Sequence, residues 1–246
     1  MKYELFYWPS IPGRGEFVRL ALEFAGADYE DVARGSATAG QGIPALLRWL
    51  HDDAIAQPPF APPVLRYGKT VVAQTAAILL YLGPRLNLVG KSEASRLWTH
   101  QIQLTISDIV GEAHDTHHPV SSALYFEDQK PEARRSAEAF RQTRLPKYLS
   151  WFEAVLARNP RKVQDGPLYL VGARLSYADL SLFQVVEGLR YAFPKASTKA
   201  LKKAPLVARL HRELAQHKRL AAYLQSERRI AFNEDGIFRR YPELDG

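Results

Sequence analysis

Two consecutive prolines in front of a predicted hairpin constrain the fold of this chain more than any other segment. Pro62 and Pro63 precede residues 64–73, which form two arms joined through the turn dipeptide Gly68-Lys69. An X-Pro bond is the only peptide bond that adopts the cis form at modest cost. Because proline has no N–H for a sheet ladder, the pair predicts that the hairpin is entered from a sheet edge or a loop.

A helix follows the hairpin directly. Residues 74–82 have helical length and composition, and the first N–H groups of a helix have no partners within it. Such an end attracts carboxylates. Thr75 offers a hydroxyl cap, and the amide of Gln74 can both donate and accept hydrogen bonds. The segment therefore predicts a site for a small anionic molecule.

This pattern resembles the glutathione-binding end of the thioredoxin-like domain of cytosolic glutathione transferases. The shared features are Pro-Val-Leu, a short hairpin, and Gln-Thr opening a helix that ends in Tyr-Leu-Gly. In that family the proline matching Pro63 is cis, and the pair matching Gln74 and Thr75 holds the γ-glutamyl group. The residue before the proline both donates to and accepts from the cysteinyl unit, whereas Pro62 can only accept. The resemblance implies glutathione as co-substrate, bound by these four residues.

Composition narrows the function classes. The 246 residues, 46% hydrophobic and 24% charged, are typical of a globular protein with one large or two modest domains. No apolar run approaches the ~18 residues of a membrane span, and Glu4 and Pro9 interrupt any signal peptide, so we expect a cytoplasmic protein without membrane contact. The chain has no cysteine. Any thiol chemistry must come from the ligand, which excludes the cysteine-type classes of the family.

The net charge of +7 is unevenly distributed. Residues 1–90 carry equal numbers of basic and acidic side chains, so the whole excess lies in residues 91–246. This asymmetry supports two domains. Nucleic-acid binding would require clustered Lys and Arg with aromatic residues in a recognisable motif, and the sequence contains none, so we expect no nucleic-acid partner.

The first part of the chain predicts an α/β thioredoxin-like domain over residues 1–84. Its expected elements are a strand at 3–8, a helix at 14–24, a strand at 27–32, a helix at 43–51, the hairpin at 64–73 and the helix at 74–82. Their order is βαβαββα, the thioredoxin-like order, and Gly83-Pro84 is expected to stop the last helix.

No strand pattern follows, so residues 93–246 predict an all-α bundle. Helices are expected at 93–116, 131–157, 176–191, 204–216 and 218–228. Ser176 and Asp179 form a capping-box pattern for the third of them, a structural feature that the family shares. The resemblance places the acceptor-substrate pocket in this domain and gives no counterpart for the tail after Glu227.

Two hydroxyls are candidates for activating the glutathione thiol. Lowering a thiol pKa from ~8.5 to about 6.5 takes roughly 2.7 kcal/mol, and one hydrogen bond to a charged group supplies roughly 1.5–3 kcal/mol. Tyr7, at the end of the first strand and ahead of Gly13-Arg14, resembles the residue of the tyrosine-type classes. Ser10, four residues before Arg14, resembles that of the serine-type classes. We favour Tyr7, keep Ser10 as the alternative, and assign Arg14 to ordering the loop and adding positive potential.

The resemblance suggests two further ligands of glutathione. Arg48 lies on the helix that offers side chains to the glycyl carboxylate, and Asp108 resembles the acid that some classes extend across the dimer interface to the γ-glutamyl ammonium. His114 and His118 are four residues apart and could share a helix face. No third ligand is marked, so we expect no metal and interpret the histidines, with His117, as a helix end or a wall of the acceptor pocket.

The resemblance as a whole implies a homodimeric glutathione transferase in which the glutathione thiolate attacks a small hydrophobic electrophile. A glutathione-dependent isomerase or peroxidase would use the same thiol. A non-catalytic ligand carrier or interaction module would keep the fold without the chemistry, and Pro62 favours that alternative most.

Overall fold

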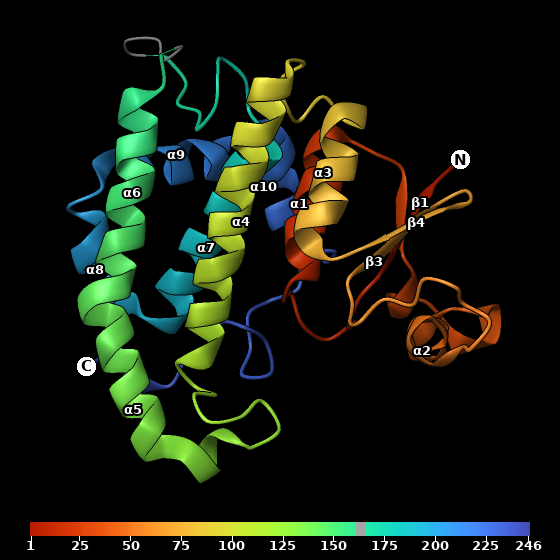
Figure 1. The fold of residues 1–246 in the computed structure, drawn as a ribbon, viewed down its shortest axis with the longest axis horizontal. Helices are drawn as coiled ribbons and strands as arrows, with labels where there is room; N and C mark the ends of the chain where they lie inside the picture. The colour runs from red at the N-terminus through yellow and green to blue at the C-terminus, as the bar shows by residue number, and fades with distance from the viewer. Residues whose placement is uncertain (161–165) are drawn as a thin grey trace.

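A four-stranded mixed sheet forms the first part of the computed structural model, which describes residues 1–160 and 166–246 (Figure 1). The strands are β1 (Tyr3–Phe6), β2 (Tyr29–Asp31), β3 (Val64–Tyr67) and β4 (Thr70–Ala73). Their order in the sheet is β2-β1-β3-β4, with β1 parallel to β2 and antiparallel to β3, and with β3 antiparallel to β4.

The register of this sheet brings three distant chain segments together at one end of the strands. Phe6 of β1 pairs with Val64 of β3, and Val64 pairs with Ala73 of β4. The chain therefore leaves β1, enters β3 and leaves β4 at the same end of the sheet. The next residue of each segment lies there too: Tyr7, Pro63 and Gln74.

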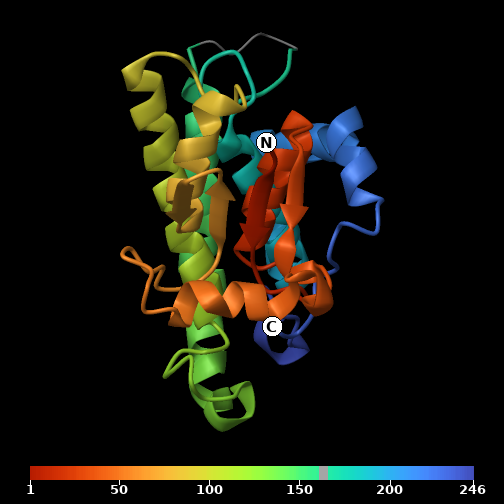
Figure 2. The same cartoon turned by 90° about the vertical axis from the view of Figure 1, so that its right-hand side faces the viewer.

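Helices cover both faces of the sheet because its side chains alternate. Leu5 of β1 packs in a cluster with residues of α1 (Gly15–Ala25) and α3 (Thr75–Arg85). Phe6, its neighbour, points to the other face and packs against α2 (Gly42–His51). Figure 2 shows α2 lying across one end of the sheet. Two short 3₁₀ turns connect β2 to α2, at Val32–Arg34 and Ala37–Ala39.

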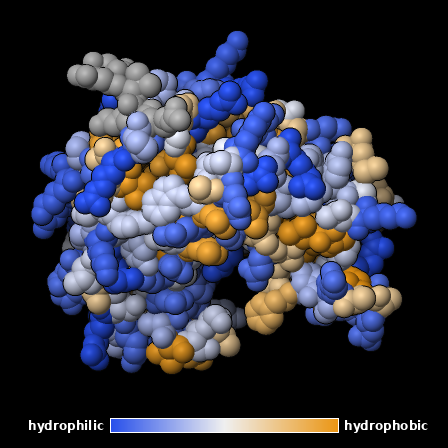
Figure 3. All heavy atoms as spheres, turned by 45° about the horizontal axis from the view of Figure 1, so that its top comes forward, coloured by the Kyte–Doolittle hydropathy of each residue, from blue (hydrophilic) through white to orange (hydrophobic). Residues whose placement is uncertain are grey.

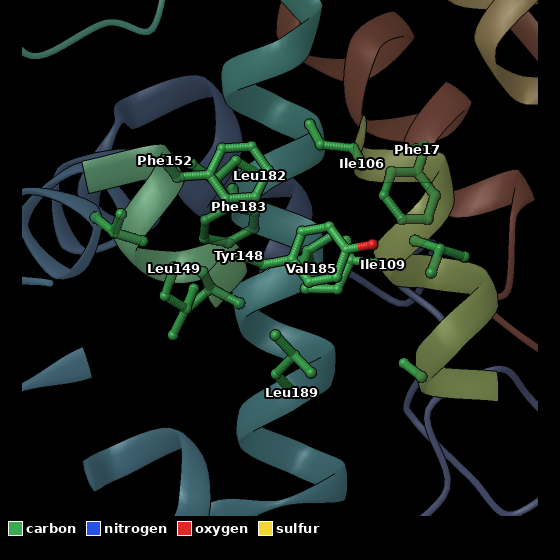
Figure 4. Close-up of a cluster of buried hydrophobic side chains, with 14 of the residues drawn as sticks. Phe17, Ile106, Ile109, Tyr148, Leu149, Phe152, Leu182, Phe183, Val185 and Leu189 are labelled. Carbon is green, nitrogen blue, oxygen red and sulfur yellow. The ribbon is translucent and has the colours of Figure 1, made fainter. Parts of the chain in front are cut away.

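The remainder is helical. Its elements are α4 (Glu93–Asp115), a 3₁₀ turn at Phe126–Gln129, α5 (Lys130–Ala139), a π-helical turn at Phe140–Arg144, α6 (Leu145–Arg158), α7 (Tyr177–Ala192), α8 (Pro194–Leu201), α9 (Pro205–Gln216), α10 (Lys218–Leu224) and α11 (Pro242–Asp245). Almost every residue of α7 is buried. Figure 4 shows α7 inside a cluster that α4 and α6 line from either side, with Phe17 of α1 pointing into it. None of the helices within the described residues has the length and hydropathy needed to cross a bilayer.

The start of α7 has the predicted capping box. The Ser176 N–H and hydroxyl both donate to Asp179 Oδ2 at 2.7 Å, and the Leu170 N–H donates to Oδ1 at 2.7 Å. Burial raises the pKa of Asp179 to about 6, against these bonds, which favour the charged form. Asp179 therefore joins the loop before α7 to the first turn of the helix.

The tail after α10 folds back onto the bundle. Ile237, Phe238 and Leu244 are each at most 4% exposed. The ring of Phe238 lies so close to α7 that a Cβ at Gly188 would come within 2.2 Å of it. Only glycine at position 188 leaves room for this contact, so the tail is an integral part of the core.

The expected fold class is confirmed, and several details differ. α3 continues through Pro84 to Arg85, although Pro84 has no N–H to donate to the carbonyl four residues earlier. The predicted helix at 131–157 is α5 and α6 joined by the π turn, the last predicted helix ends at Leu224 instead of 228, and α8 was not predicted. The division into domains at 1–84 and 93–246 stays a prediction.

Candidate functional site

The Tyr7 side chain lies beneath the loop between β1 and α1. It is 4% exposed, and its Oη accepts a hydrogen bond from the Arg14 N–H at 2.8 Å. Two glycines make room for the ring: a Cβ would fall 2.2 Å from Oη at Gly13 and 2.5 Å from Cγ at Gly15. Gly13 also has φ +44°, a conformation that side chains rarely adopt. The glycines therefore fix the phenol at the start of α1.

The phenol is held in its protonated form. Burial raises the pKa of Tyr7 above its ordinary value, while the Arg14 N–H and the charges of Arg14 and Arg19 act in the opposite direction. Tyr7 Oη already accepts a hydrogen bond from the backbone, so its own proton is available for another acceptor. Tyr7 is thus arranged as a hydrogen-bond donor.

Gln74 occupies the residue before α3 in an unusual conformation. Its φ is +68° and ψ +122°, one of two positive φ values at non-glycine residues within the described part of the chain. Such a backbone costs on the order of 1–3 kcal/mol and persists where the surroundings impose it, often at ligand sites. The Gln74 side chain is exposed beside the first N–H groups of α3, which is the position expected of an anion-binding amide.

Thr75 does not cap α3, contrary to the prediction. It is the first residue of the helix, and its hydroxyl donates to the carbonyl oxygen of Arg14 at 3.3 Å. The cap position belongs to Gln74, whose side chain makes no capping hydrogen bond. The Thr75 hydroxyl instead joins the start of α3 to the start of α1.

The peptide bond between Pro62 and Pro63 is cis, as predicted for Pro63. Pro63 is buried and Pro62 half-buried. The register of β1 and β3 places this pair beside Tyr7, and that of β3 and β4 places it beside Gln74.

A cavity of about 390 Å³ lies between α1, α3 and α4, and Gln74 lines it, whereas Tyr7, Pro62 and Pro63 do not. Its polar lining includes Arg14, Gln74 and Thr75, and its apolar lining comes from Phe17, Leu80, Leu104, Ile106 and Val110. Asp108 is exposed on α4 beside Ser107, which lines the cavity. The structure therefore unites three of the predicted residues and leaves Asp108 at the margin.

Two predicted residues lie elsewhere. Arg48 Nη2 donates to the Gly40 carbonyl at 3.3 Å and lines a separate cavity of about 420 Å³, together with Glu4 and Arg66. The Ser10 side chain is exposed, and its backbone carbonyl accepts a hydrogen bond from Asn233 Nδ2 of the tail at 2.8 Å.

A buried charge cluster behind the site was not predicted. Glu16, one residue into α1, is fully buried and accepts from Tyr223 Oη at 2.6 Å, from Arg229, and from Arg19 at 3.4 Å. Arg19 also pairs with Asp31 at 2.7 Å. An acid and a base three residues apart on an apolar helix face were the only local signal, since Tyr223 and Arg229 are more than 200 residues away.

The three histidines do not share a helix face, because α4 ends at Asp115. His114 is in its last turn, while His117 and His118 follow it. Burial lowers the pKa of His117 to about 3 and that of His118 to about 4, and it also lowers the pKa of His114. All three rings are therefore neutral at physiological pH.

Comparison with known proteins agrees with the fold. Residues 114–227 match the family described as glutathione S-transferase, C-terminal domain. The glutathione S-transferase of Plasmodium falciparum is 26% identical over 204 residues, 82% of this chain and 86% of that protein. Glutathione S-transferase Mu 6 of Mus musculus is 28% identical over 200 residues, 79% of each. A Pi-class glutathione S-transferase structure from Onchocerca volvulus shares the fold, with a TM-score of 0.66 at 21% identity over 92% of this chain and 93% of that one.

The chain belongs to the cytosolic glutathione transferase family. Membership explains the order of its parts: a thioredoxin-like sheet with the cis-proline and Gln74 at one end of its strands, followed by the helical bundle around α7. As a family member it departs from the expected pattern at Pro62, which lacks an N–H, and in the tail, which packs against α7 and reaches the Ser10 loop.

Proposed function

We propose that this chain is a glutathione transferase that binds glutathione at the start of α3 and activates its thiol with Tyr7. The observation that carries the proposal is the convergence of Tyr7, the cis-proline pair and Gln74 at one end of the sheet, where β1 and β4 end and β3 begins. The N-termini of α1 and α3 meet at this end of the sheet, where they favour the carboxylate and the thiolate of the ligand.

Tyr7 provides the specific chemistry. Because its Oη accepts from the Arg14 N–H and its proton is free, it can donate to a sulfur placed above the α1 loop. A hydrogen bond to the thiolate supplies roughly 1.5–3 kcal/mol, which covers the roughly 2.7 kcal/mol needed to lower the thiol pKa by about two units. The activated thiolate then attacks a small hydrophobic electrophile held nearby.

The homodimer is proposed from exposed apolar side chains. Phe60 is 94% exposed just before the proline pair, and Leu97 and Leu104 on α4 are 63% and 48% exposed. Figure 3 shows apolar patches interrupting an otherwise hydrophilic surface. Packing against a second copy would remove this surface from water. Asp108 lies on α4 together with Leu97 and Leu104. A dimer that buries these leucines would bring Asp108 near the second copy, so we retain its proposed role toward the partner's glutathione.

One observation favours the non-catalytic carrier as a second candidate. Pro62 cannot donate a backbone hydrogen bond to the ligand, so the site offers glutathione one donor fewer than the family pattern. A carrier would bind glutathione or an apolar ligand without enriching the thiolate. Glutathione-dependent isomerisation or peroxide reduction would share the activated thiol and differ only in the acceptor.

Calorimetric titration of glutathione tests the binding site. Gln74→Ala should weaken binding about tenfold or more, because it removes the amide beside the α3 N-terminus. Gln216→Ala is the matched control, since Gln216 is exposed at the end of α9, away from the cavity. Equal affinities of the two variants would contradict the assignment, and a wild type that fails to bind millimolar glutathione would favour the carrier.

A further inference from the structure

Three histidines at the end of α4 turn their ring nitrogens toward one another. His114 lies in the last turn of the helix, and His117 and His118 follow it. One ring nitrogen of each lies within 4.8 Å of the other two, and Nδ1 of His117 is 2.5 Å from Nδ1 of His118. We propose that these three residues form a binding site for a divalent d-block metal ion such as Zn²⁺. The sequence lacked a clear third ligand, and His117 supplies it.

Hydrogen bonds on the outer side orient two of the rings for coordination. His117 Nε2 lies 2.8 Å from the Ile237 carbonyl oxygen, and His114 Nδ1 lies 3.2 Å from Asp115 Oδ1. Both partners are acceptors, so these nitrogens carry the protons and the other nitrogen of each ring is unprotonated. In His117 this is Nδ1, whose lone pair faces His118 Nδ1. Metal-binding histidines generally show this arrangement, with the second N–H donated to a carbonyl or a carboxylate.

The ligand set selects the class of metal. Three imidazoles with an open fourth position match the histidine sites of zinc proteins, and imidazole suits zinc, copper and nickel better than magnesium or calcium. Two charged side chains act on His118 with opposite sign, Arg239 against a bound cation and Asp115 in its favour. Zn–N bonds of about 2.0–2.1 Å in tetrahedral geometry separate the nitrogens by roughly 3.3 Å. The facing Nδ1 atoms of His117 and His118, 2.5 Å apart, would therefore have to separate by roughly 0.8 Å to bind one ion.

The site would connect α4 to the C-terminal tail. His117 already holds the Ile237 carbonyl, and Tyr241 of the tail stacks on Phe126 with a centroid distance of 3.8 Å. Figure 1 shows the tail, drawn in blue, passing the lower end of α4. The same tail reaches the Ser10 loop through Asn233. A bound metal would therefore fix the tail against both the bundle and the loop of the thiol site.

Metal titration of chelator-treated protein without an affinity tag tests the site. Zn²⁺ is titrated in competition with a chromophoric chelator, and Co²⁺ is added separately to record its visible absorption. Wild type should bind one equivalent, and Co²⁺ should give the intense bands of a tetrahedral nitrogen site. His118→Gln and His114→Gln should each weaken Zn²⁺ binding at least tenfold. His51→Gln is the matched control, since His51 is exposed on α2, and it should match wild type.

Hydrogen exchange gives a second measurement that does not depend on any one variant. Zn²⁺ should slow exchange of the backbone around residues 233–241 in wild type and in His51→Gln. Circular dichroism establishes that each variant is folded, and His114→Gln, whose ring is 23% exposed, carries the comparison if His118→Gln unfolds. Absence of stoichiometric binding by wild type, or equal binding by His114→Gln, would overturn the proposal and leave the histidines as a packing contact for the tail.

Discussion

Replacing Tyr7 with phenylalanine separates the proposed donor from the packing of its ring. The ring fills the space left by Gly13 and Gly15, so the variant should keep the loop and bind glutathione with nearly unchanged affinity. It loses two hydrogen bonds: the one accepted from the Arg14 N–H and the one proposed to the thiolate. These two losses affect different quantities, namely folding stability and the thiol pKa.

The magnitudes follow from these bonds. Leaving the Arg14 N–H without its acceptor should lower the free energy of unfolding by about 1 kcal/mol. Loss of the donor should raise the pKa of bound glutathione by roughly one to two units, equivalent to about 1.4–2.7 kcal/mol. Near pH 6.5 the conjugation rate should fall roughly ten- to hundredfold.

The pH profile distinguishes thiol activation from a general loss of activity. Above about pH 9 the thiol ionises without help, since its free pKa is near ~8.5, so the rates of wild type and Tyr7→Phe should converge. Because burial keeps the pKa of the Tyr7 phenol above its ordinary value, Tyr7 stays protonated over this range and the wild-type rate should show no alkaline loss from it. Thiolate ultraviolet absorbance of bound glutathione, recorded across the same pH series, gives the pKa directly.

Ser10→Ala is the control for this experiment. The Ser10 side chain is exposed, and the contact with Asn233 uses its carbonyl, which the substitution keeps. The pKa of the glutathione thiol bound to Ser10→Ala should match that of glutathione bound to wild type. A pKa shift in Ser10→Ala without one in Tyr7→Phe would refute the assignment in favour of the serine-type alternative, and no thiolate enrichment in wild type would refute thiol activation altogether.

The remaining predictions concern stability and assembly. Asp179→Ala should lower the free energy of unfolding by roughly 3 kcal/mol, because it leaves three buried donors without an acceptor, while Ser176→Ala should cost only about 0.5–2 kcal/mol; equal midpoints in urea denaturation would contradict this ranking. Phe60→Ser should shift the proposed dimer toward monomer in sedimentation velocity. Val120→Ser, a change at a 60% exposed side chain, should not, and a monomeric wild type would exclude the dimer.

Local patterns predicted most of the fold. The Gly68-Lys69 turn and the Ser176 capping box were readable because their interactions lie within a few residues of one another. α8 was missed because only Ser197 and Ala200 of its eight residues are buried, which gives no apolar period. The π turn at Phe140–Arg144 has no distinctive composition, so the surrounding sequence predicted one uninterrupted helix.

The candidate site was predictable where the motif is contiguous and not where it depends on the path of the chain. The pair Pro62-Pro63 precedes its strand directly, and the cis bond was foreseen from the family pattern. The positive φ of Gln74 was not foreseen, because it follows from how β4 turns into α3. His117 joins its neighbours only because α4 ends at Asp115, a boundary that sequence fixes to within a few residues at best.

The buried charge cluster at Glu16 has a consequence for the order in which the chain becomes folded during synthesis. Glu16 leaves the ribosome early, but two of its partners, Tyr223 and Arg229, follow 207 and 213 residues later. Before they emerge, Arg19 alone faces the carboxylate, at 3.4 Å, and burying an incompletely paired charge costs several kcal/mol. The nascent α1 should therefore dock only loosely on the sheet. The loop that carries Tyr7 becomes rigid only after Tyr223 and Arg229 have been released.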